Sequence, residues 1–403
     1  MIVKEVLPNG LTVVLKQTKG FGIVSGVLFF RGGILDEKVA GSTRLATYLT
    51  IKGSERFSKD EIAETFEDYG GGLGTSTADE YSTVEFSTKV EGLRRAFEVL
   101  GDMVLRPRFS EEDLEREKRN TITAIRSEKE NPFRFAYSEL KRLTFGGTPY
   151  ERDTLGDEES VMGITREVLL KRWGELVKGG RMVLSVVGDF ESAEEVLKSI
   201  GEFFGAVPSE GFSYPRFEKP IGENALKRVH REGSQSTIIC AFNAPAYDSG
   251  DYWAGKVFNA VLGDGFTSLL FRELREKRGY AYATTSFYPT KINLPRFFTY
   301  VGTSPDKEEG ALRDMLEITA SMPFGAEDVE VAKRKIVGDW LMDHQTRLRQ
   351  AWYLGWFETI GLGYELDAVY TDRIREVSFE EVRAIREKYI DSLHHCAVVS
   401  PKG

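Results

Sequence analysis

Arg44, Thr47 and Tyr48 have a spacing that could support chemistry. They lie in residues 41–54, which read as a short helix ending in a tight turn, so the three side chains share one helix face. Histidine and glutamate at such positions would bind a metal ion and activate water. Arginine has no lone pair for a metal and stays protonated, and threonine has no basic group. We therefore expect a filled, hydrogen-bonded helix face.

The other metal-binding and nucleophilic side chains are few and scattered. None of the four histidines pairs with another at helical spacing, and the adjacent His394 and His395 would point to opposite faces of a strand. There is no C-x-x-C and no zinc-finger spacing. Cys240 and Cys396 each lie in an apolar, strand-like run. We expect both to be buried free thiols, and no metal in this chain.

The composition is that of a globular protein with two or three domains. The chain has 403 residues, 41% of them hydrophobic, which is enough to bury a full core. Its net charge of -9 argues against a general nucleic-acid binder, which needs a basic face. No stretch approaches the ~20 apolar residues of a membrane span, and the first residues lack the regions of a signal peptide. We expect a cytoplasmic protein without a membrane partner.

Strand and helix signals alternate along the first half. Asn9-Gly10 between alternating apolar residues predicts a hairpin. Ser58, followed by Glu61, forms a capping box at the start of a helix. Ser110 begins a long helix that reaches about Lys129. Further strands are expected over residues 23–30, 73–78, 83–90 and 182–187.

The same order of elements begins again after residues 205–225, which are rich in Gly, Pro and Ser. Phe109-Ser-Glu-Glu-Asp-Leu-Glu aligns with Phe324-Gly-Ala-Glu-Asp-Val-Glu. The pattern predicts two homologous domains of about 200 residues, each an α+β unit with a mainly antiparallel sheet packed with helices. They would span residues 1–204 and 226–403, joined by the linker 205–225. Duplicated domains commonly face each other across a cleft, and clefts bind ligands.

Several motifs occur in an order that points to a known family. They are Leu7-Pro-Asn-Gly-Leu, Gly70-Gly-Gly-Leu-Gly-Thr-Ser-Thr, Val186-Val-Gly-Asp, and Leu262-Gly-Asp-Gly-Phe-Thr-Ser-Leu-Leu-Phe-Arg-Glu-Leu-Arg-Glu-Lys-Arg-Gly-Tyr-Ala-Tyr. Together they resemble the pitrilysin/insulinase family of zinc peptidases, in particular its branch similar to the mitochondrial processing peptidase. The resemblance covers nearly the whole chain and implies two facing α+β domains.

The zinc motif of that family is missing. Arg44, Thr47 and Tyr48 take the places of its H-x-x-E-H, and Ala124 takes the place of its third ligand, a glutamate on the long helix. A catalytic zinc needs three protein ligands. Without them and the base, zinc hydrolysis is not expected at this site. Glu117 remains on the long helix, where it could form an ion pair with Arg44.

The resemblance implies a catalytic role for Arg275 and Tyr282. In the family, an Arg and a Tyr seven positions apart in the second domain bind the scissile region of the peptide. A guanidinium and a phenol can donate hydrogen bonds to a peptide carbonyl as it becomes an oxyanion. Arg278 and Tyr280 fit the spacing less well. The alternative is a solvated arginine and an ordinary strand tyrosine.

The resemblance also implies that a peptide is added as an extra strand to an edge of the first sheet. The matching residues are Leu73, Gly74, Thr75 and Ser76. Their small side chains would permit close approach, although they are equally consistent with a plain flexible strand.

These features lead to two functional hypotheses. In the first, the chain is the non-zinc subunit of a heterodimeric peptidase and acts on peptides or unfolded segments. A homologous partner would supply zinc and the base, and this chain would supply Arg275 and Tyr282. In the second, the chain is a non-enzymatic peptide-binding or scaffold subunit. A homodimer of the isolated chain is compatible with either hypothesis.

Overall fold

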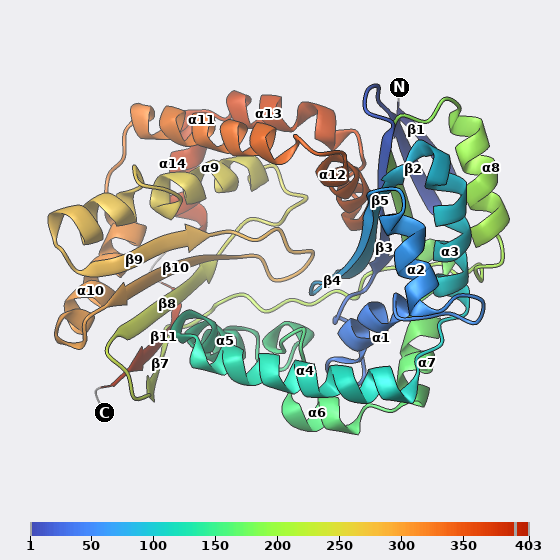
Figure 1. The fold of residues 1–403 in the computed structure, drawn as a ribbon. Helices are drawn as coiled ribbons and strands as arrows, with labels where there is room; N and C mark the ends of the chain where they lie inside the picture. Colours follow the sequence, from blue (N-terminus) through green and yellow to red (C-terminus); the bar gives the residue numbers. More distant parts are fainter. Residues whose placement is uncertain (1, 391–392, 402–403) are drawn as a thin grey trace. The chain divides into compact units, whose positions relative to one another are not determined.

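The computed structural model describes residues 2–390 and 393–401 and divides into two compact units (Figure 1). Unit 1 comprises Met1–Arg126, Asp153–Pro215 and Asp343–Ala368, and unit 2 comprises Ser127–Arg152, Arg216–Met342 and Val369–Gly403. Each unit contains one mainly antiparallel sheet packed with helices, which confirms the expected α+β class. The boundaries 1–204 and 226–403 follow the internal repeat and stay a prediction.

The sheet of unit 1 has the strand order β1-β2-β6-β3-β5-β4. Its strands are β1 (Ile2–Val6), β2 (Thr12–Gln17), β3 (Ile23–Arg31), β4 (Gly72–Thr77), β5 (Tyr81–Lys89) and β6 (Met182–Gly188). Strands β1 and β2 form the predicted hairpin, in which Gly10 has a φ of +91° that favours glycine. Among the described strands of this sheet, β2 and β6 form the one parallel pair.

Unit 1 contains the helices predicted in residues 41–54, after Ser58 and after Ser110, together with others, some of which were not predicted. They are α1 (Ser42–Thr50), α2 (Lys59–Glu67), α3 (Leu93–Leu105), α4 (Glu111–Glu130, shared with unit 2), α6 (Glu158–Gly163), α7 (Arg166–Leu176), α8 (Ala193–Phe204) and α12 (Arg347–Ile360). Short 3₁₀ turns lie at Val90–Gly92, Pro149–Glu151, Gly179–Arg181 and Pro305–Lys307. Ser58 and Glu61 form the predicted capping box of α2.

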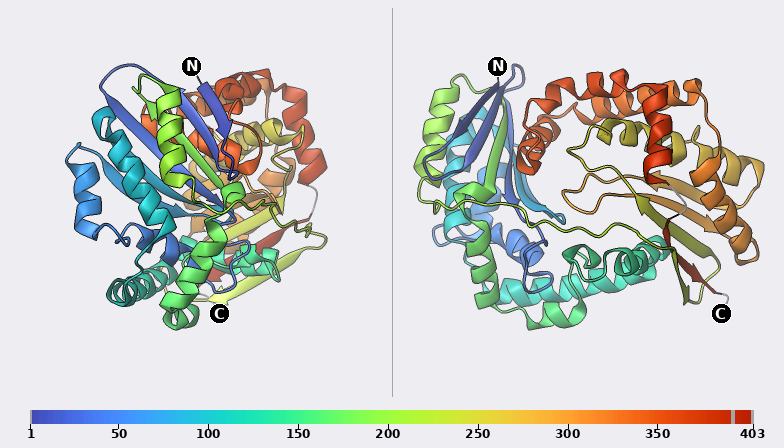
Figure 2. Two further views of the ribbon diagram at one scale, coloured as in Figure 1. Left: turned by 90° about the vertical axis from the view of Figure 1, so that its right-hand side faces the viewer. Right: turned by 180° about the vertical axis from the view of Figure 1, so that it is seen from behind.

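Both faces of the unit 1 sheet are buried. On β3, Leu28 and Phe30 point into the larger core, beneath helices such as α1, α3 and α7. Val27 and Phe29 point to the opposite face, which α12 covers (Figures 1 and 2). Gly355 lets α12 approach closely, since a Cβ at this position would stand 2.5 Å from the Phe29 ring. Alternate side chains of a strand thus fill two separate cores.

The sheet of unit 2 has the order β7-β11-β8-β10-β9. Its strands are β7 (Ala225–His230), β8 (Ser236–Asn243), β9 (Ala281–Phe287), β10 (Arg296–Thr303) and β11 (His395–Ser400). Its helices are α5 (Pro132–Phe145), α9 (Tyr252–Gly263), the π-helix η4 (Phe271–Lys277), α10 (Glu308–Ser321), α11 (Ala326–Asp343), α13 (Leu366–Glu376) and α14 (Phe379–Tyr389).

Helix α5 covers one face of the unit 2 sheet, against β8 and β11. Its aromatic side chains meet aromatic side chains of β10, with Tyr137 5.4 Å from Phe298 and Phe133 5.0 Å from Tyr300 between ring centroids. On the other face, the core includes side chains of α9, α10 and α14. Helix α5 comes from the first half of the sequence and α12 from the second, so each unit borrows a helix from the other half.

The expectation of two free thiols is wrong. Cys240 and Cys396 form a disulfide, because they stand directly opposite each other on the antiparallel strands β8 and β11. Spacing along the chain could not show this pairing, since the two residues are 156 positions apart. Disulfides persist mainly in oxidising compartments and, as an exception, inside hyperthermophile cells. The cytoplasmic location therefore stays a prediction.

Replacing both Cys240 and Cys396 with alanine is expected to lower the free energy of unfolding by about 2–4 kcal/mol, because the bond closes a long loop in the unfolded chain. Urea unfolding with and without a thiol reductant would measure the change. The reductant should destabilise the parent protein and leave the double variant unaffected. Two titratable thiols in the unfolded, unreduced parent would contradict the pairing.

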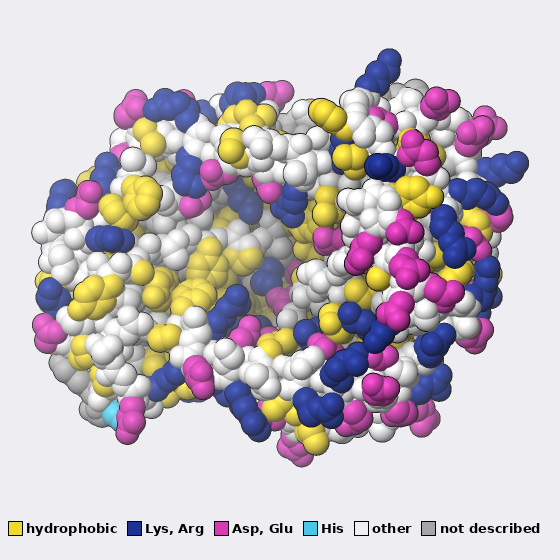
Figure 3. Space-filling view, viewed as in Figure 1, with side chains coloured by type: hydrophobic (Ala, Val, Ile, Leu, Met, Phe, Trp, Pro, Cys, Tyr) yellow, Lys and Arg dark blue, Asp and Glu magenta, His cyan; other side chains and the backbone are white. Residues whose placement is uncertain are grey.

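The surface carries charges of both signs. On the face shown in Figure 3, Lys and Arg side chains are interspersed with Asp and Glu side chains. Among the described residues, no helix has both the length and the apolar content needed to cross a bilayer.

Candidate functional site

Helix α1 carries Arg44, Thr47 and Tyr48, and residues of the preceding loop fix its start. Gly41 precedes the helix with a φ of +84°. The Glu37 carboxylate accepts the backbone N–H groups of Gly41 at 3.1 Å and Thr43 at 3.0 Å. Burial raises the pKa of Glu37, although these hydrogen bonds oppose the shift. A carboxylate in this place satisfies free N–H groups of the helix.

Arg172 of α7 is the second anchor of α1. Its side chain is buried, and Nε donates to Thr43 Oγ1 at 2.9 Å. Nη2 donates to the Gly33 carbonyl and to Asp36 Oδ1, both at 2.8 Å. Burial of Asp36 favours its neutral form, but the charges of Arg172 and Arg181 outweigh this effect and lower its pKa. The arginine thus connects α7, α1 and the loop before α1.

Arg44 forms the predicted ion pair with the long helix α4. Its Nη2 lies 3.3 Å from Glu117 Oε1, and its Nη1 donates to Thr121 Oγ1 at 2.9 Å. Asn120 Nδ2 donates to the other carboxylate oxygen of Glu117 at 3.1 Å. The Arg44 guanidinium therefore binds both the Glu117 carboxylate and the Thr121 hydroxyl of α4.

Neither Thr47 nor Tyr48 leaves room for a ligand, and Ala124 has no donor atom. Thr47 is buried, and its hydroxyl donates to the Thr43 carbonyl at 2.8 Å. The Tyr48 ring packs beneath the Lys52 ammonium, with 4.7 Å between Nζ and the ring centroid. Ala124 on α4 is half-buried and offers only a methyl group.

This donor set does not fit zinc. Arg44 stays protonated, and Ala124 has no donor atom. The Glu117 carboxylate on α4 is already engaged by Arg44 and Asn120. Zinc sites in enzymes use at least three protein ligands. Within the part of the chain that the structure describes, no three His, Cys, Asp or Glu side chains are grouped so that they could hold a metal ion.

Arg275 lies in unit 2 on η4. The segment is wound as a π-helix, a form that is rare and frequent at functional sites. The Arg275 side chain is exposed, and its guanidinium carbon lies 5.2 Å from the centroid of the Phe271 ring. Among the described residues, it has no ion-pair partner.

The neighbouring cations differ from Arg275, because each has a carboxylate partner. Arg272 pairs with Asp328 at 2.9 Å, Lys277 with Glu273 at 2.6 Å, and Arg278 with Asp314 at 3.2 Å. Arg278, the less favoured candidate from the sequence, is therefore already engaged. Arg275 keeps its donors free for a ligand.

Tyr282 lies on β9, the last strand of the unit 2 sheet, and its side chain is 62% exposed. Ala283 pairs with Gly302 of β10 and Ala281 pairs with Thr303, so Tyr282 is the extra residue of a β-bulge. Bulges re-aim side chains and are common beside active sites. Because η4 packs against β9, Arg275 and Tyr282 belong to adjacent elements.

Lys256 on α9 supports the loop that follows β9. Its ammonium donates to the Tyr288 carbonyl at 3.1 Å and to Thr290 Oγ1 at 3.0 Å. The rings of Tyr252 and Tyr288 flank it, with centroids at 5.3 and 5.1 Å. Burial lowers the pKa of Lys256 to about 8.

Replacing Lys256 with methionine is expected to remove a pH dependence from the free energy of unfolding, because only the parent carries a proton at this site. The folded-state pKa of about 8 lies below the usual 10.5, so the unfolded parent binds more protons between these values. Between pH 7 and pH 10 the free energy of unfolding of the parent should therefore rise by about 1–3 kcal/mol relative to that of the variant. Urea unfolding at pH 7 and pH 10 measures both, and a constant difference would contradict the prediction.

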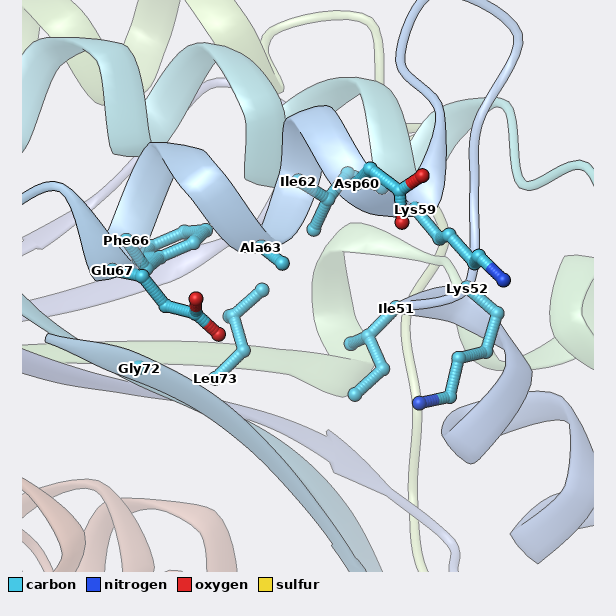
Figure 4. A pocket seen from close by; sticks show the side chains of 10 residues that line it. All are labelled: Ile51, Lys52, Lys59, Asp60, Ile62, Ala63, Phe66, Glu67, Gly72 and Leu73. Atoms are coloured by element: carbon cyan, nitrogen blue, oxygen red, sulfur yellow. The ribbon is translucent and has the colours of Figure 1, made fainter.

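Strand β4, which carries Leu73, Gly74, Thr75 and Ser76, is the other candidate ligand site. It ends the unit 1 sheet and pairs only with β5 among the described strands. Its outer backbone groups are therefore available to an added strand. A pocket with a volume of about 300 Å³ adjoins it (Figure 4). This pocket and the anchor Arg172 were not expected from the sequence.

Two models of one peptidase family match this chain, and relatives match it over nearly its whole length. Residues 12–158 match the family described as Insulinase (Peptidase family M16), and residues 163–336 match the family described as Peptidase M16 inactive domain. An "uncharacterized zinc protease YmxG" of Bacillus subtilis is 23% identical over 409 residues, covering 100% of this chain and 99% of that protein. An "uncharacterized zinc protease" of Rickettsia felis is 23% identical over 406 residues, covering 98% and 96%.

Solved structures share the fold over the whole chain. A peptidase M16 inactive domain from Pseudomonas fluorescens superposes with a TM-score of 0.92 at 20% identity, covering 100% of this chain and 98% of that one. A protease from Helicobacter pylori superposes with a TM-score of 0.90 at 16% identity, covering 100% and 99%. The chain belongs to peptidase family M16, the insulinase family.

Proposed function

We propose that this chain is the non-zinc subunit of a two-subunit peptidase. A homologous partner with an intact H-x-x-E-H motif would bind zinc and carry the base. This chain would contribute Arg275 and Tyr282 to peptide binding at the partner's site. The observation that carries the proposal is the contrast between the two candidate sites: Arg44 is engaged at the former zinc site, whereas Arg275 is free.

The two residues suit a peptide carbonyl. Arg275 can donate N–H groups and Tyr282 its hydroxyl, and such donors stabilise the negative charge that develops on the oxygen during hydrolysis. The π-helix and the β-bulge set the direction of each side chain through the backbone, so these positions do not depend on a mobile loop. Zinc held by the partner would supply the activated water.

The expected substrates are peptides and unfolded segments. The open edge of β4 can bind an extended backbone through main-chain hydrogen bonds, which read the backbone more than the side chains. Peptides and unfolded segments present such a backbone along their whole length. The alternative function, a non-enzymatic peptide-binding or scaffold subunit, uses the same edge and is favoured by the filled positions around Arg44.

Association with a zinc-bearing relative separates the two functions. The experiment co-expresses this chain with an H-x-x-E-H homologue from the same genome and measures the mass of the purified complex by light scattering. The proposal predicts one copy of each chain in the complex. Two separate homodimers that do not exchange subunits would contradict it and favour the scaffold function.

A further inference from the structure

The pocket beside β4 has an apolar floor and a charged rim. Its floor is formed by side chains from the end of α1, from α2 and from β4, namely Ile51, Ile62, Ala63, Phe66 and Leu73. The rim carries Lys52, Lys59, Asp60 and Glu67 (Figure 4). A volume of about 300 Å³ lies at the lower end of typical ligand pockets and suits one or two amino-acid side chains.

The charges on the rim are separated. Lys52 and Lys59 lie on one side of the pocket together with the Asp60 carboxylate, whereas Glu67 lies on the opposite side (Figure 4). Neither lysine has an ion-pair partner among the described residues. Lys59 is exposed at the first position of α2. With two lysines and one aspartate, the first side keeps one net positive charge and attracts a carboxylate, whereas the Glu67 side repels one.

Lys52 is held in place by the residues of the former zinc motif. Its ammonium lies 4.7 Å from the centroid of the Tyr48 ring, and the Arg44 guanidinium carbon lies 5.9 Å from the same centroid. Arg44 is in turn tied to Glu117. The contact with the Tyr48 ring holds the Lys52 ammonium in place without neutralising its charge.

The open edge of β4 relates the pocket to an incoming strand. Leu73 lines the pocket from this strand. Residues that pair across two strands point to the same face of the sheet, and so do residues two positions apart in one strand. A peptide residue paired opposite Leu73 would therefore point toward the pocket, and a residue two positions away would point toward its rim.

We infer that this pocket selects extended peptides with an apolar residue and a carboxylate two positions away on one defined side. The apolar side chain fills the pocket, the peptide backbone pairs with β4, and Lys52 with Lys59 binds the carboxylate. The carboxylate comes either from an Asp or Glu side chain or from the peptide's own C-terminus. This inference rests on the proposed peptide-binding function and adds its sequence preference.

Fluorescence anisotropy with labelled eight-residue peptides tests the preference. Each peptide carries one central leucine, with Glu two positions before it, Glu two positions after it, or Gln at both. One of the two Glu peptides should bind about three- to tenfold more tightly than the Gln peptide, and the other should not. A peptide that ends in a free carboxylate at the favoured position, compared with its amide, distinguishes the C-terminus from a side chain as the source.

Variants of the protein assign the effect to this pocket. Lys59→Glu and Lys52→Glu together should reverse the preference, so that a Lys peptide binds better than the Glu peptide. Ala63→Trp, on the exposed face of α2, should fill the pocket and weaken binding of every leucine peptide about tenfold or more. Lys198→Glu, an exposed change on α8, is the matched control and should change nothing. Equal thermal midpoints establish that the variants are folded.

Two results would overturn the inference. One is equal affinity for the Glu and Gln peptides, and the other is a preference that survives the double charge reversal. These measurements use this chain alone, so they are independent of a zinc-bearing partner. A paired enzyme that cleaves peptides without this preference would refute the inference and leave the proposed function standing. If this chain shows the preference but no partner forms a cleaving enzyme with it, the inference stands and the proposed function is refuted.

Discussion

Replacing Arg172 with alanine is expected to lower the free energy of unfolding by about 3–5 kcal/mol, among the largest effects of any single substitution in this chain. The guanidinium is buried and donates to Thr43, Gly33 and Asp36. Its removal leaves Asp36 with one cation fewer and leaves the Gly33 carbonyl short of a donor. Chemical unfolding followed by circular dichroism measures the loss.

Two features of the experiment make the Arg172 prediction specific. Lys171→Ala on the same helix is the matched control, because Lys171 is exposed and should change the stability by less than about 0.5 kcal/mol. The variant should also loosen α1, so amide protection of residues 42–50 should fall more than that of α8. An Arg172→Ala effect no larger than the control would show that the buried network does not anchor the helix.

Replacing Arg275 with alanine is expected to reduce kcat/KM of the paired enzyme by about 10²- to 10³-fold, the loss typical of an oxyanion-stabilising donor. Tyr282→Phe removes one hydroxyl and should have a similar, smaller effect. Both side chains are exposed and lie outside the cores, so neither variant should change the stability or the mass of the complex. Peptide hydrolysis by the complex measures the change.

Lys277→Ala on the same π-helix is the control for this prediction. Lys277 is exposed and pairs with Glu273, and its loss should leave the rate unchanged. If Arg275 acts mainly in the transition state, kcat and kcat/KM should fall together, whereas a rise in KM alone would indicate ground-state binding. An Arg275→Ala complex with parental activity would remove the residue from the proposed site.

Features set by neighbouring residues could be predicted from the sequence. The Asn9-Gly10 turn and the capping box of Ser58 depend on local backbone chemistry, and both occur as expected. The ion pair between Arg44 and Glu117 was a hypothesis from the sequence, and the structure contains it. The internal repeat likewise indicated two sheets, each packed with helices.

Features that depend on distant pairing could not be predicted. The disulfide requires β8 and β11 to be neighbours, which no local pattern reveals. The π-helix and the bulge at Tyr282 each insert a single residue, and the segments on either side are too short for the sequence to reveal the change of phase. Arg172 resembles a surface residue of an amphipathic helix until the loop that it contacts is known.

The sequence also does not reveal that α5 packs on the unit 2 sheet and α12 on the unit 1 sheet. Helix α12 has apolar residues on more than one side, as expected for a buried helix, but nothing in its sequence names the sheet that it covers. The same holds for α5 and the unit 2 sheet. Partners of long, apolar helices are chosen by tertiary packing, which a single sequence does not reveal.

The central claim is that hydrolysis needs two chains, of which this one carries no zinc. The most direct test measures cleavage of an unfolded peptide and bound zinc for this chain alone, for an H-x-x-E-H homologue alone and for their complex. The account predicts that only the complex cleaves efficiently and that its zinc corresponds to one ion per partner chain. Cleavage by this chain alone with stoichiometric zinc, or a complex no faster than the homologue alone, would contradict it.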